Sequence, residues 1–339
     1  MRTAIVHNRL TDDASEADRD TLVQVSAISA ALERLGHQTV QLSCDLDLHA
    51  LRQALCEARP DLVFNLVESL DGADWLAFFV TALLDRLGLP YTGSPTAAMF
   101  LTNHKLLAKQ RLREAGLTTP DWLAPAEAAH YQGQSTLGRP GADARFLIKA
   151  ITEHASVGMD EDCLVRFQDE DQLRSRLQTY QQEAGRAYFA EQYIDGREFN
   201  ISLLAANDGP QVLPPAEIDF SAYPAGKARI VDYKAKWIEH SFEYNNTPRT
   251  FEFPARDAPL LERVSRMAAQ CWPLFGLRGY ARVDFRVDDR GRPYILEINA
   301  NPCLSPDSGF PAAGERAGFS YDELVRRIVA AARPADGCP

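Results

Sequence analysis

The sequence predicts an α/β protein with parallel strands near its N-terminus and an antiparallel hairpin near its C-terminus. Across residues 1–67, short apolar runs alternate with segments whose apolar residues recur at helical spacing. This β-α-β-α-β order is typical of a parallel sheet covered by helices. Residues 279–299 instead form two runs of alternating apolar and polar residues around the turn residues 288–291. A chain of 339 residues is long for one hydrophobic core, so two or three domains are expected.

The N-terminal region is expected to contain three strands and two helices. They are a strand at residues 3–6, a helix at 22–35, a strand at 38–42, a helix at 48–58 and a strand at 62–67. Gly36 stands where the C-terminal cap of the first helix belongs. No G-x-G-x-x-G motif follows the first strand, which disfavours dinucleotide binding.

Two further helices are expected before the middle of the chain. Residues 75–87 form a strongly apolar helix that ends at a glycine. Ser94 and Pro95 then predict a helix start, with Ser94 as the N-cap and Pro95 in the first helical position. This second helix carries Lys105 on its surface, and a linker follows it.

The strand predicted at residues 146–150 is a candidate phosphate site. It carries Lys149 near its end and leads into the small-residue loop 151–159. A lysine in this position can bind phosphate through its charge, together with the backbone N–H groups of the loop. The loop is not G-x-x-x-x-G-K-[ST], so the P-loop class of nucleotide-binding proteins is excluded.

Two acidic residues follow on the next pair of strands. The strand at residues 188–194 carries Glu191, and a turn leads from it to Glu198 and the strand at 200–206. Residues 222–254 are polar, aromatic and irregular, and such long segments are usually functional covers or disordered. Helices are expected at residues 260–275 and 321–332.

The C-terminal hairpin predicts a magnesium site. Its alternation places Arg282 and Asp284 on one face of the first strand, and Glu297 and Asn299 on one face of the second. A register that pairs Asp284 with Glu297 also pairs Arg282 with Asn299. Two carboxylates and an amide oxygen suit magnesium better than zinc, and a guanidinium beside them suits a phosphoryl oxygen or an oxyanion.

The alternative interpretation of this face is a charged, solvated surface, which is the usual condition of either strand alone. Both strands together, followed by the Pro/Ser-rich loop 301–311, favour a site. The same alternation predicts that Tyr294, Leu296 and Ile298 share the opposite face.

Composition describes an ordinary globular protein, with 45% hydrophobic and 24% charged residues. The net charge of -11 argues against nucleic acid or an anionic membrane as a partner. The chain starts without a signal-peptide apolar region, and no apolar run approaches the roughly 18 residues of a membrane helix. Six scattered cysteines without C-x-x-C spacing fit a reducing cytoplasm, and Cys303 is interpreted as structural.

In this order, the two lysines, the two glutamates and the hairpin resemble the ATP-grasp ligases, specifically the D-alanine–D-alanine ligase family. Residues 88–93 (GLPYTG) and 233–237 (YKAKW) extend the resemblance over most of the chain. It implies an ATP-grasp fold with an N-terminal Rossmann-like domain at residues 1–98, a central lid domain at 99–192 and a catalytic domain at 193–333. It further implies ATP and two Mg²⁺ ions as cofactors, Mn²⁺ as a substitute, and a homodimer.

The resemblance also implies a role for each candidate residue. Three are assigned to catalysis: Arg282, Lys236 and Ser156. Six are assigned to the nucleotide: Lys105, Lys149, Glu191, Tyr193, Ile194 and Glu198. Three are assigned to the metal: Asp284, Glu297 and Asn299. Five are assigned to the substrates: Ser308, Gly309, Trp237, His154 and Glu68.

The chain departs from the family in the pocket for the first amino acid. The family has a serine in the phosphate loop and a tyrosine in the covering loop, whereas this sequence has Ala155 and Trp237. The acid that would face the substrate from the N-terminal region remains open among Glu16, Asp18 and Asp20. A pocket that loses buried polar partners changes its substrate preference strongly.

The resemblance therefore implies an ADP-forming carboxylate–amine ligase that joins two amino-acid-like substrates through an acyl phosphate. One alternative is the same chemistry on an L-amino acid, a peptide or a specialised-metabolite acid. The other is a non-catalytic nucleotide-binding protein with this fold, which the complete set of Lys149, Asp284, Glu297 and Asn299 weighs against.

Overall fold

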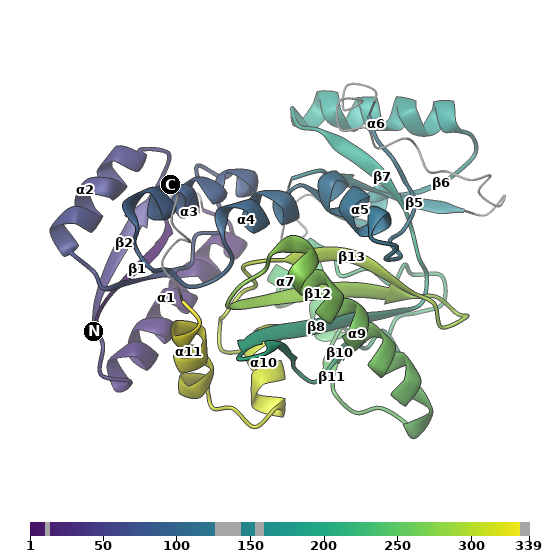
Figure 1. Cartoon of the computed structure of the whole chain (residues 1–339). Helices are drawn as coiled ribbons and strands as arrows, with labels where there is room; N and C mark the ends of the chain where they lie inside the picture. The colour runs from purple at the N-terminus through teal and green to yellow at the C-terminus, as the bar shows by residue number, and fades with distance from the viewer. Residues whose placement is uncertain (11–13, 126–143, 153–158, 333–339) are drawn as a thin grey trace.

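The computed structural model describes residues 1–10, 14–125, 144–152 and 159–332. In these ranges the chain builds three β-sheets with helices packed against them, which confirms the predicted α/β class (Figure 1). None of the helices in the same ranges is long and apolar enough to cross a membrane.

The N-terminal sheet is parallel, as predicted, and has the order β2-β1-β3. Its strands are β1 (Arg2–Asn8), β2 (Gln38–Cys44) and β3 (Leu62–Asn65), with helices α1 (Glu16–Arg34), α2 (Leu48–Ala58) and α3 (Phe78–Leu87). The central strand β1 is buried on both faces, because Ala4 and Val6 join one hydrophobic cluster and Ile5 joins another. A continuous apolar run is what such a strand requires.

The central sheet is antiparallel and has the order β4-β7-β5-β6. Its strands are β4 (Trp122–Leu123), β5 (Arg145–Ala150), β6 (Leu164–Arg166) and β7 (Tyr188–Gln192). Helix α6 (Glu170–Ala184) covers it with Leu173 and Leu177, and Asp169 caps the start of the helix by accepting the N–H of Gln172 at 2.8 Å. The sequence predicted β5 and β7 but neither α6 nor the two edge strands.

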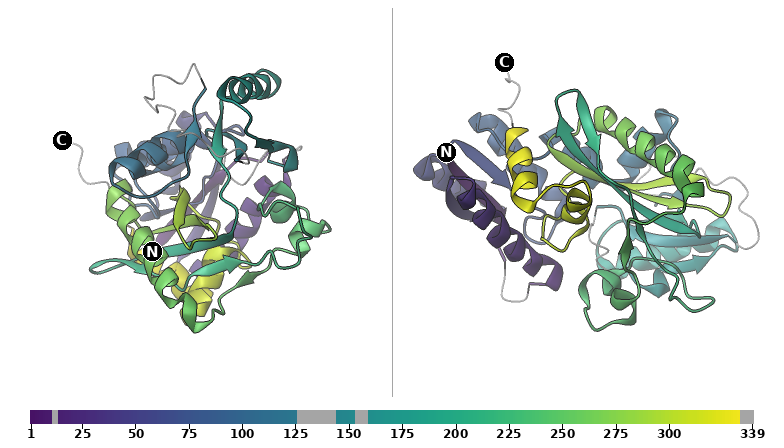
Figure 2. Two further views of the ribbon diagram at one scale, coloured as in Figure 1. Left: turned by 90° about the vertical axis from the view of Figure 1, so that its right-hand side faces the viewer. Right: turned by 90° about the horizontal axis from the view of Figure 1, so that it is seen from below.

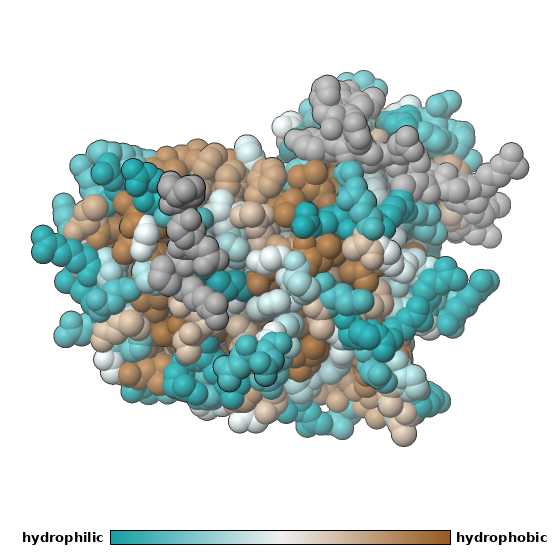
Figure 3. All heavy atoms as spheres, in the orientation of Figure 1, coloured by the Kyte–Doolittle hydropathy of each residue, from teal (hydrophilic) through white to brown (hydrophobic). Residues whose placement is uncertain are grey.

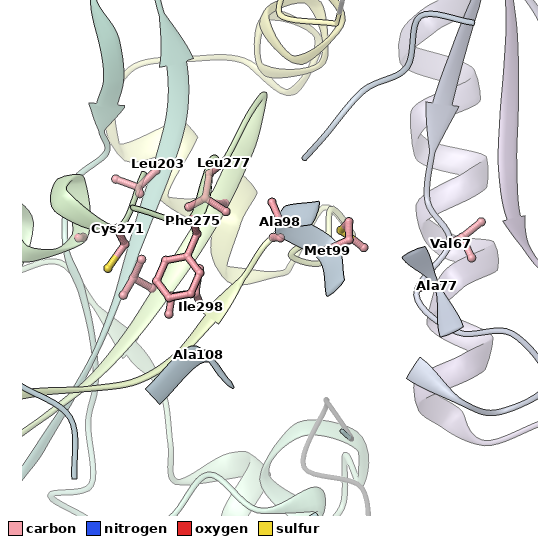
Figure 4. Packing of buried hydrophobic residues seen from close by; sticks show 14 of the residues in the cluster. Val67, Ala77, Ala98, Met99, Ala108, Leu203, Cys271, Phe275, Leu277 and Ile298 are labelled. Atoms are coloured by element: carbon pink, nitrogen blue, oxygen red, sulfur yellow. The ribbon is translucent and has the colours of Figure 1, made fainter. Parts of the chain in front are cut away.

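The C-terminal sheet is also antiparallel and has the order β11-β10-β8-β12-β13, with β9 paired to β8. Its strands are β8 (Arg197–Ala206), β9 (Gly209–Val212), β10 (Ala216–Ile218), β11 (Arg249–Thr250), β12 (Tyr280–Val287) and β13 (Pro293–Asn299). Helix α9 (Ala258–Phe275) packs on one face, where Figure 4 shows Leu203, Cys271, Phe275 and Ile298 in contact. Burial of this face leaves the other face of β12 and β13 for the polar residues.

Six shorter helices complete the described chain. They are α4 (Thr96–Asn103), α5 (Lys105–Glu114), α7 (Tyr233–Trp237), α8 (Phe242–Asn245), α10 (Gly309–Arg316) and α11 (Tyr321–Ala330), with 3-10 turns at Asp74–Leu76, Glu161–Cys163 and Ala255–Asp257. Helix α11 lies beside α1 (Figure 2), where Arg34 donates to both carboxylate oxygens of Asp322 at 2.8 and 2.6 Å. The chain therefore returns to the N-terminal sheet near its end.

Two predictions about the helices around Lys105 are wrong. Ser94 is not an N-cap, because its hydroxyl donates to the carbonyl of Arg278 at 3.3 Å and α4 begins two residues later. The predicted continuous helix is broken at His104, whose Nδ1 accepts the N–H of Leu107 at 3.2 Å. Lys105 consequently occupies the first turn of α5 instead of the surface of α4.

The predicted face of β13 is also wrong in part. The ladder shifts register directly after Asp284, as at a β-bulge. As a result Ile295 and Ile298 both enter the core, while Leu296 lies on the opposite face. Tyr294, Leu296 and Ile298 therefore do not share a face, because one extra residue interrupts the two-residue period.

The segment 222–254, predicted to be irregular, contains α7, α8 and the short strand β11. Asp232 caps α7 by accepting the N–H of Ala235 at 2.9 Å. Lys227 anchors α8 through an ion pair with Glu243 at 2.8 Å. Helix caps and an ion pair thus stabilise short helices in a segment where no periodic pattern of apolar residues predicts them.

Candidate active site

A cavity of about 700 Å³ lies between the three sheets. Each residue to which the family resemblance assigns a role lines it, apart from His154 and Ser156, which lie outside the described residues together with Ala155. The structure therefore brings residues from α5, β5, β7, β8, α7 and the β12–β13 hairpin to one place.

The hairpin register is the one predicted, with Asp284 opposite Glu297 and Arg282 opposite Asn299. Arg282 donates to both carboxylate oxygens of Asp284, from Nε at 2.7 Å and from Nη2 at 2.8 Å. Asn299 donates from Nδ2 to Oδ2 of Asp284 at 3.0 Å. Asn200 on β8 donates to Oδ1 at 2.8 Å, and this residue was not predicted because its position depends on strand pairing.

These contacts bear on whether the hairpin can hold magnesium. The two oxygens of Asp284 each accept two hydrogen bonds, so their lone pairs are occupied. Asn299 uses its amide nitrogen for Asp284, which leaves its amide oxygen as an acceptor. Together with Glu297 these hard oxygen donors fit Mg²⁺ chemically. A cation bound by Glu297 and Asp284 would have to replace some of the hydrogen bonds that Asp284 accepts.

Three cations surround Glu297. Burial by itself would lower the pKa of Arg282, yet Asp284 and then Glu297 raise it above its ordinary value. Burial lowers the pKa of Lys236, and Glu297 is the largest influence opposing that shift. Glu297 also helps to keep Lys149 charged. This part of the cavity therefore combines acidic oxygens with positive charges that suit phosphate.

Glu191 holds two lysines in the buried wall of the cavity. Lys149 donates to its Oε1 at 2.5 Å and Lys109 donates to its Oε2 at 2.6 Å. Lys109 also donates to Thr119 at 2.7 Å, and its side chain is 1% exposed. The family resemblance assigns Glu191 to the adenine, whereas in this structure both of its oxygens are bonded to lysines.

The pKa values of this trio follow from burial and charge. Burial alone would raise the pKa of Glu191, but Lys109 and Lys149 hold it below its ordinary value. Burial lowers the pKa of Lys109 to about 8, and Glu191 opposes the shift. Lys109 was not predicted, although its position four residues after Lys105 places both lysines on one side of a helix.

Arg286 fixes the segment that contains Glu198. It donates to Oε2 of Glu198 at 3.0 Å and to the carbonyl oxygens of Ile194 and Gly196 at 3.0 and 3.1 Å. Gly196 has a φ of +140°, and a Cβ there would lie 2.0 Å from the carbonyl oxygen of Val287. Only glycine can therefore make this turn, which brings Ile194 and Glu198 to the cavity.

A hydrogen-bonded group joins the N-terminal helix α1 to the loop after β13. Asp20 accepts from the hydroxyl of Ser305 at 2.6 Å and from the thiol of Cys303 at 3.0 Å. Gln24 donates to Glu68 at 2.8 Å and accepts the N–H of the residue after Cys303. Burial, followed by Glu68 and Asp20, raises the pKa of Cys303 strongly, so its thiol stays protonated and structural.

Of the three N-terminal acids left open by the sequence, Asp20 lines the cavity. Glu16 is exposed at the start of α1, and the side chain of Asp18 is not among those described. Asp20 and Glu68 therefore both contribute negative charge to the cavity.

Ser308, Gly309 and Arg249 also line the cavity, next to Cys303. Ser308 donates its hydroxyl to the carbonyl of Cys303 at 2.8 Å, which folds the loop back before α10. A Cβ on Gly309 would lie 3.4 Å from Nε of Arg249, so the guanidinium rests directly against this glycine. Arg249 was not predicted, since β11 gave no periodic signal.

The chain is similar in sequence to known proteins of one family. The family model for the D-ala D-ala ligase C-terminus matches residues 112–330. The D-alanine–D-alanine ligase of Moorella thermoacetica is 32% identical over 317 residues, covering 90% of this chain and 91% of that protein. The ligase of Synechococcus sp. (strain JA-3-3Ab) is 32% identical over 309 residues, covering 91% of this chain and 88% of that protein. An uncharacterized Sinorhizobium fredii protein is 31% identical over 315 residues, covering 89% of this chain and 85% of that protein.

Solved structures agree on the fold. The crystal structure of D-alanine–D-alanine ligase from Bacillus anthracis complexed with ATP superposes with a TM-score of 0.71 at 24% identity, covering 98% of this chain and 97% of that chain. The chain therefore belongs to the D-alanine–D-alanine ligase family of ATP-grasp enzymes, which are ligases that form C–N bonds.

Proposed function

We propose that this family member joins two amino-acid-like substrates in the 700 Å³ cavity, at the expense of ATP and through an acyl phosphate. The observation that carries the proposal is the convergence of Asp284, Glu297 and Asn299 with Lys149 and Lys236 around one space. Such an arrangement suits phosphoryl transfer, in which positioning and charge neutralisation supply most of the catalysis.

One group of cavity residues is proposed to bind ATP. Lys105 and Lys149 bind the phosphates of ATP, while Glu198 meets the ribose. Tyr193 and Ile194 contact the adenine, next to Glu191, whose carboxylate positions Lys149.

The hairpin residues act on the reacting groups. Asp284, Glu297 and Asn299 would hold magnesium, either one ion or two, with manganese as a substitute. The ion, when bound, neutralises phosphate charge. Lys236 binds the phosphoryl group in transfer, and Arg282 stabilises the oxyanion that forms when the amine attacks the acyl phosphate.

The first substrate is proposed to carry an ammonium group that faces Asp20 and Glu68. The relatives' names give D-alanine as their substrate. Trp237 lines this cavity where the family has a tyrosine, which favours a larger or less polar first substrate. The alternatives are therefore an L-amino acid, a peptide or a specialised-metabolite acid. His154 and Ser156 remain predicted parts of the substrate site and the catalytic site.

The test is phosphate release with a panel of amino acids and dipeptides of both hands, with and without magnesium. We expect release that depends on magnesium and on an added amine. Nucleotide binding without amine-dependent release would identify a non-catalytic binding protein instead, which is the second candidate function.

Three further expectations accompany this proposal. The domain division at residues 1–98, 99–192 and 193–333 is supported because each described sheet falls within one of these ranges. A cytoplasmic location remains a prediction. A homodimer is supported by exposed aromatic residues on one surface, where Figure 3 shows hydrophobic atoms over α3 and α4. These residues are Phe79 on α3 and Phe100 on α4, which are 36% and 44% exposed and both contact Phe78.

A further inference from the structure

Arg249 lies in the cavity wall on the edge strand β11, opposite Ile218 of β10. Its guanidinium rests against Gly309, where a Cβ would lie 3.4 Å from both Nε and Nη2. Nε is fully buried and donates no hydrogen bond to any residue that the structure describes. A buried charged donor without an acceptor is costly, so the position calls for an explanation.

Three other arginines in or near this cavity are paired with carboxylates. Arg282 is bonded to Asp284, Arg286 to Glu198, and Arg197 to Glu217. Arg249 has no such partner among the described residues, although Asp307 lies close enough to attract it electrostatically. Burial and then the nearby Arg282 lower the pKa of Arg249, so its surroundings disfavour the positive charge it carries. An anion bound from the cavity would balance this charge through the part of the guanidinium that lines the cavity, because the buried Nε itself has no exposed surface.

The surroundings of Arg249 indicate which anion that is. The guanidinium faces the cavity beside Ser308 and Gly309, where α10 begins and backbone N–H groups add partial positive charge. The nucleotide lysines belong to other elements, since Lys105 is on α5 and Lys149 is on β5. The planar fork of an arginine matches a carboxylate through two parallel hydrogen bonds.

We propose that Arg249 binds a carboxylate of the second substrate, the amine, and so selects amines that carry a free acid group. This inference rests on the proposed function and adds a specificity residue to it. Arg282 donates hydrogen bonds to both carboxylate oxygens of Asp284. Arg249, beside Ser308 and Gly309, has no carboxylate partner among the described residues and is therefore the better candidate to bind the substrate's acid group. Arg249 then positions the acid, and Arg282 remains directed at the reacting carbonyl.

The test compares second substrates that differ only in this acid group. Alanine and alaninamide of each hand are supplied with the first substrate that gives the fastest phosphate release. For the wild-type protein we expect kcat/KM for the acid to exceed that for the amide by about 10- to 100-fold, as for the loss of a charged hydrogen-bonded pair. In Arg249→Gln this ratio should fall to about one, mainly through KM.

Two variants support the interpretation. Arg249→Lys keeps the charge without the fork, and we expect an intermediate ratio of acid to amide. Arg256→Gln is the matched control, because Arg256 is an exposed arginine a few residues away, and we expect it to keep the wild-type ratio. Thermal unfolding of each variant identifies a folding defect, in which case Arg249→Lys carries the test.

Three outcomes would count against the assignment. Equal kcat/KM for acid and amide in the wild type overturns it, and so does a wild-type ratio retained in Arg249→Gln. A failure of every amine to stimulate phosphate release overturns the proposed function and this inference with it. In the first outcome phosphate release still depends on the amine, so the proposed ligase function stands and only the role of Arg249 in substrate selection is rejected.

Discussion

Asp284 on β12 lies directly opposite Glu297 on β13, at the last paired position before the ladder shifts register. The two carboxylates thus share one face, yet their surroundings differ. Asp284 is saturated by hydrogen bonds from Arg282, Asn200 and Asn299. Glu297 instead lies in the field of several cations of the cavity. The two acids should therefore respond differently to substitution.

Glu297→Gln should weaken magnesium binding about 10- to 100-fold, since it removes the charge of a proposed ligand while keeping its shape. Magnesium titration of phosphate release measures the effect. Asp284→Asn should cost more, because it also releases Arg282 from its two-oxygen pairing. Asp289→Asn, an exposed acid in the turn of the same hairpin, serves as the control and should titrate like the wild type. An unchanged magnesium midpoint in Glu297→Gln would remove this residue from the metal site.

Strand alternation was sufficient to predict the faces of β12 along its whole length and those of β13 from Glu297 onward. Because side chains alternate between the two faces of a strand, few pairing registers bury both Val283 and Ile298. The observed register, which pairs these two residues, is one of them. Alternation was not sufficient beyond the bulge, where Leu296 reaches the cavity instead of the core. A bulge is decided by packing around the whole sheet, which the alternation of one strand does not contain.

The site residues that were not predicted have one property in common. Asn200, Lys109 and Arg249 act through partners far away in the chain, at separations that no local pattern reports. The lysines, glutamates and hairpin acids were predicted because they follow a known order of motifs. The predicted continuous helix through His104 was wrong because the His104 side chain caps the start of a new helix, which the helical spacing of apolar residues does not reveal.

Lys149→Ala should weaken ATP binding by about tenfold to a hundredfold, the loss expected for one charged hydrogen bond. Isothermal titration with ATP and magnesium measures it. The variant should remain folded, because Glu191 keeps its second bond to Lys109. Arg176→Ala, an exposed cation of α6, is the control for a general loss of positive charge. Wild-type affinity in folded Lys149→Ala would exclude the residue from the nucleotide site.

Glu191→Gln should destabilise the protein by roughly 3–5 kcal/mol, because it leaves Lys109 and Lys149 buried without a counter-charge. Urea unfolding measures the free energy. Since Lys109 and Lys149 hold the pKa of Glu191 below its ordinary 4.5, its stabilising contribution is present above that pH. The difference between wild type and variant should shrink as the pH falls below 4.5. A difference that does not change with acidification would contradict the lysine pairing.

Nucleotide should protect residues 233–247 from proteolysis if this segment closes over the reacting groups. Lys234 and Lys236 offer trypsin sites on α7, which is only five residues long, and α8 after it has only four residues. We expect cleavage in this segment to slow severalfold with magnesium and a non-hydrolysable ATP analogue. Cleavage after Arg256, outside the segment, gives the internal reference. The companion prediction for residues 152–159 falls largely outside the described residues. Equal cleavage rates with and without nucleotide would argue against closure.

D-alanine should be a poor first substrate for this enzyme. Trp237 lines the cavity where the family has a tyrosine, and an indole can donate a hydrogen bond but cannot accept one. Ala155, outside the described residues, removes a hydroxyl that the family places nearby. A small polar substrate left without those partners loses roughly 1–3 kcal/mol, about a tenfold to hundredfold loss in kcat/KM. Comparing D-alanine with larger amino acids and dipeptides as the first substrate measures the preference. Trp237→Tyr should shift it back toward D-alanine, whereas Trp75→Tyr, at an exposed tryptophan that does not line the cavity, should not. Rapid D-alanyl-D-alanine synthesis at low millimolar D-alanine would show that the two replacements are compensated elsewhere in the cavity.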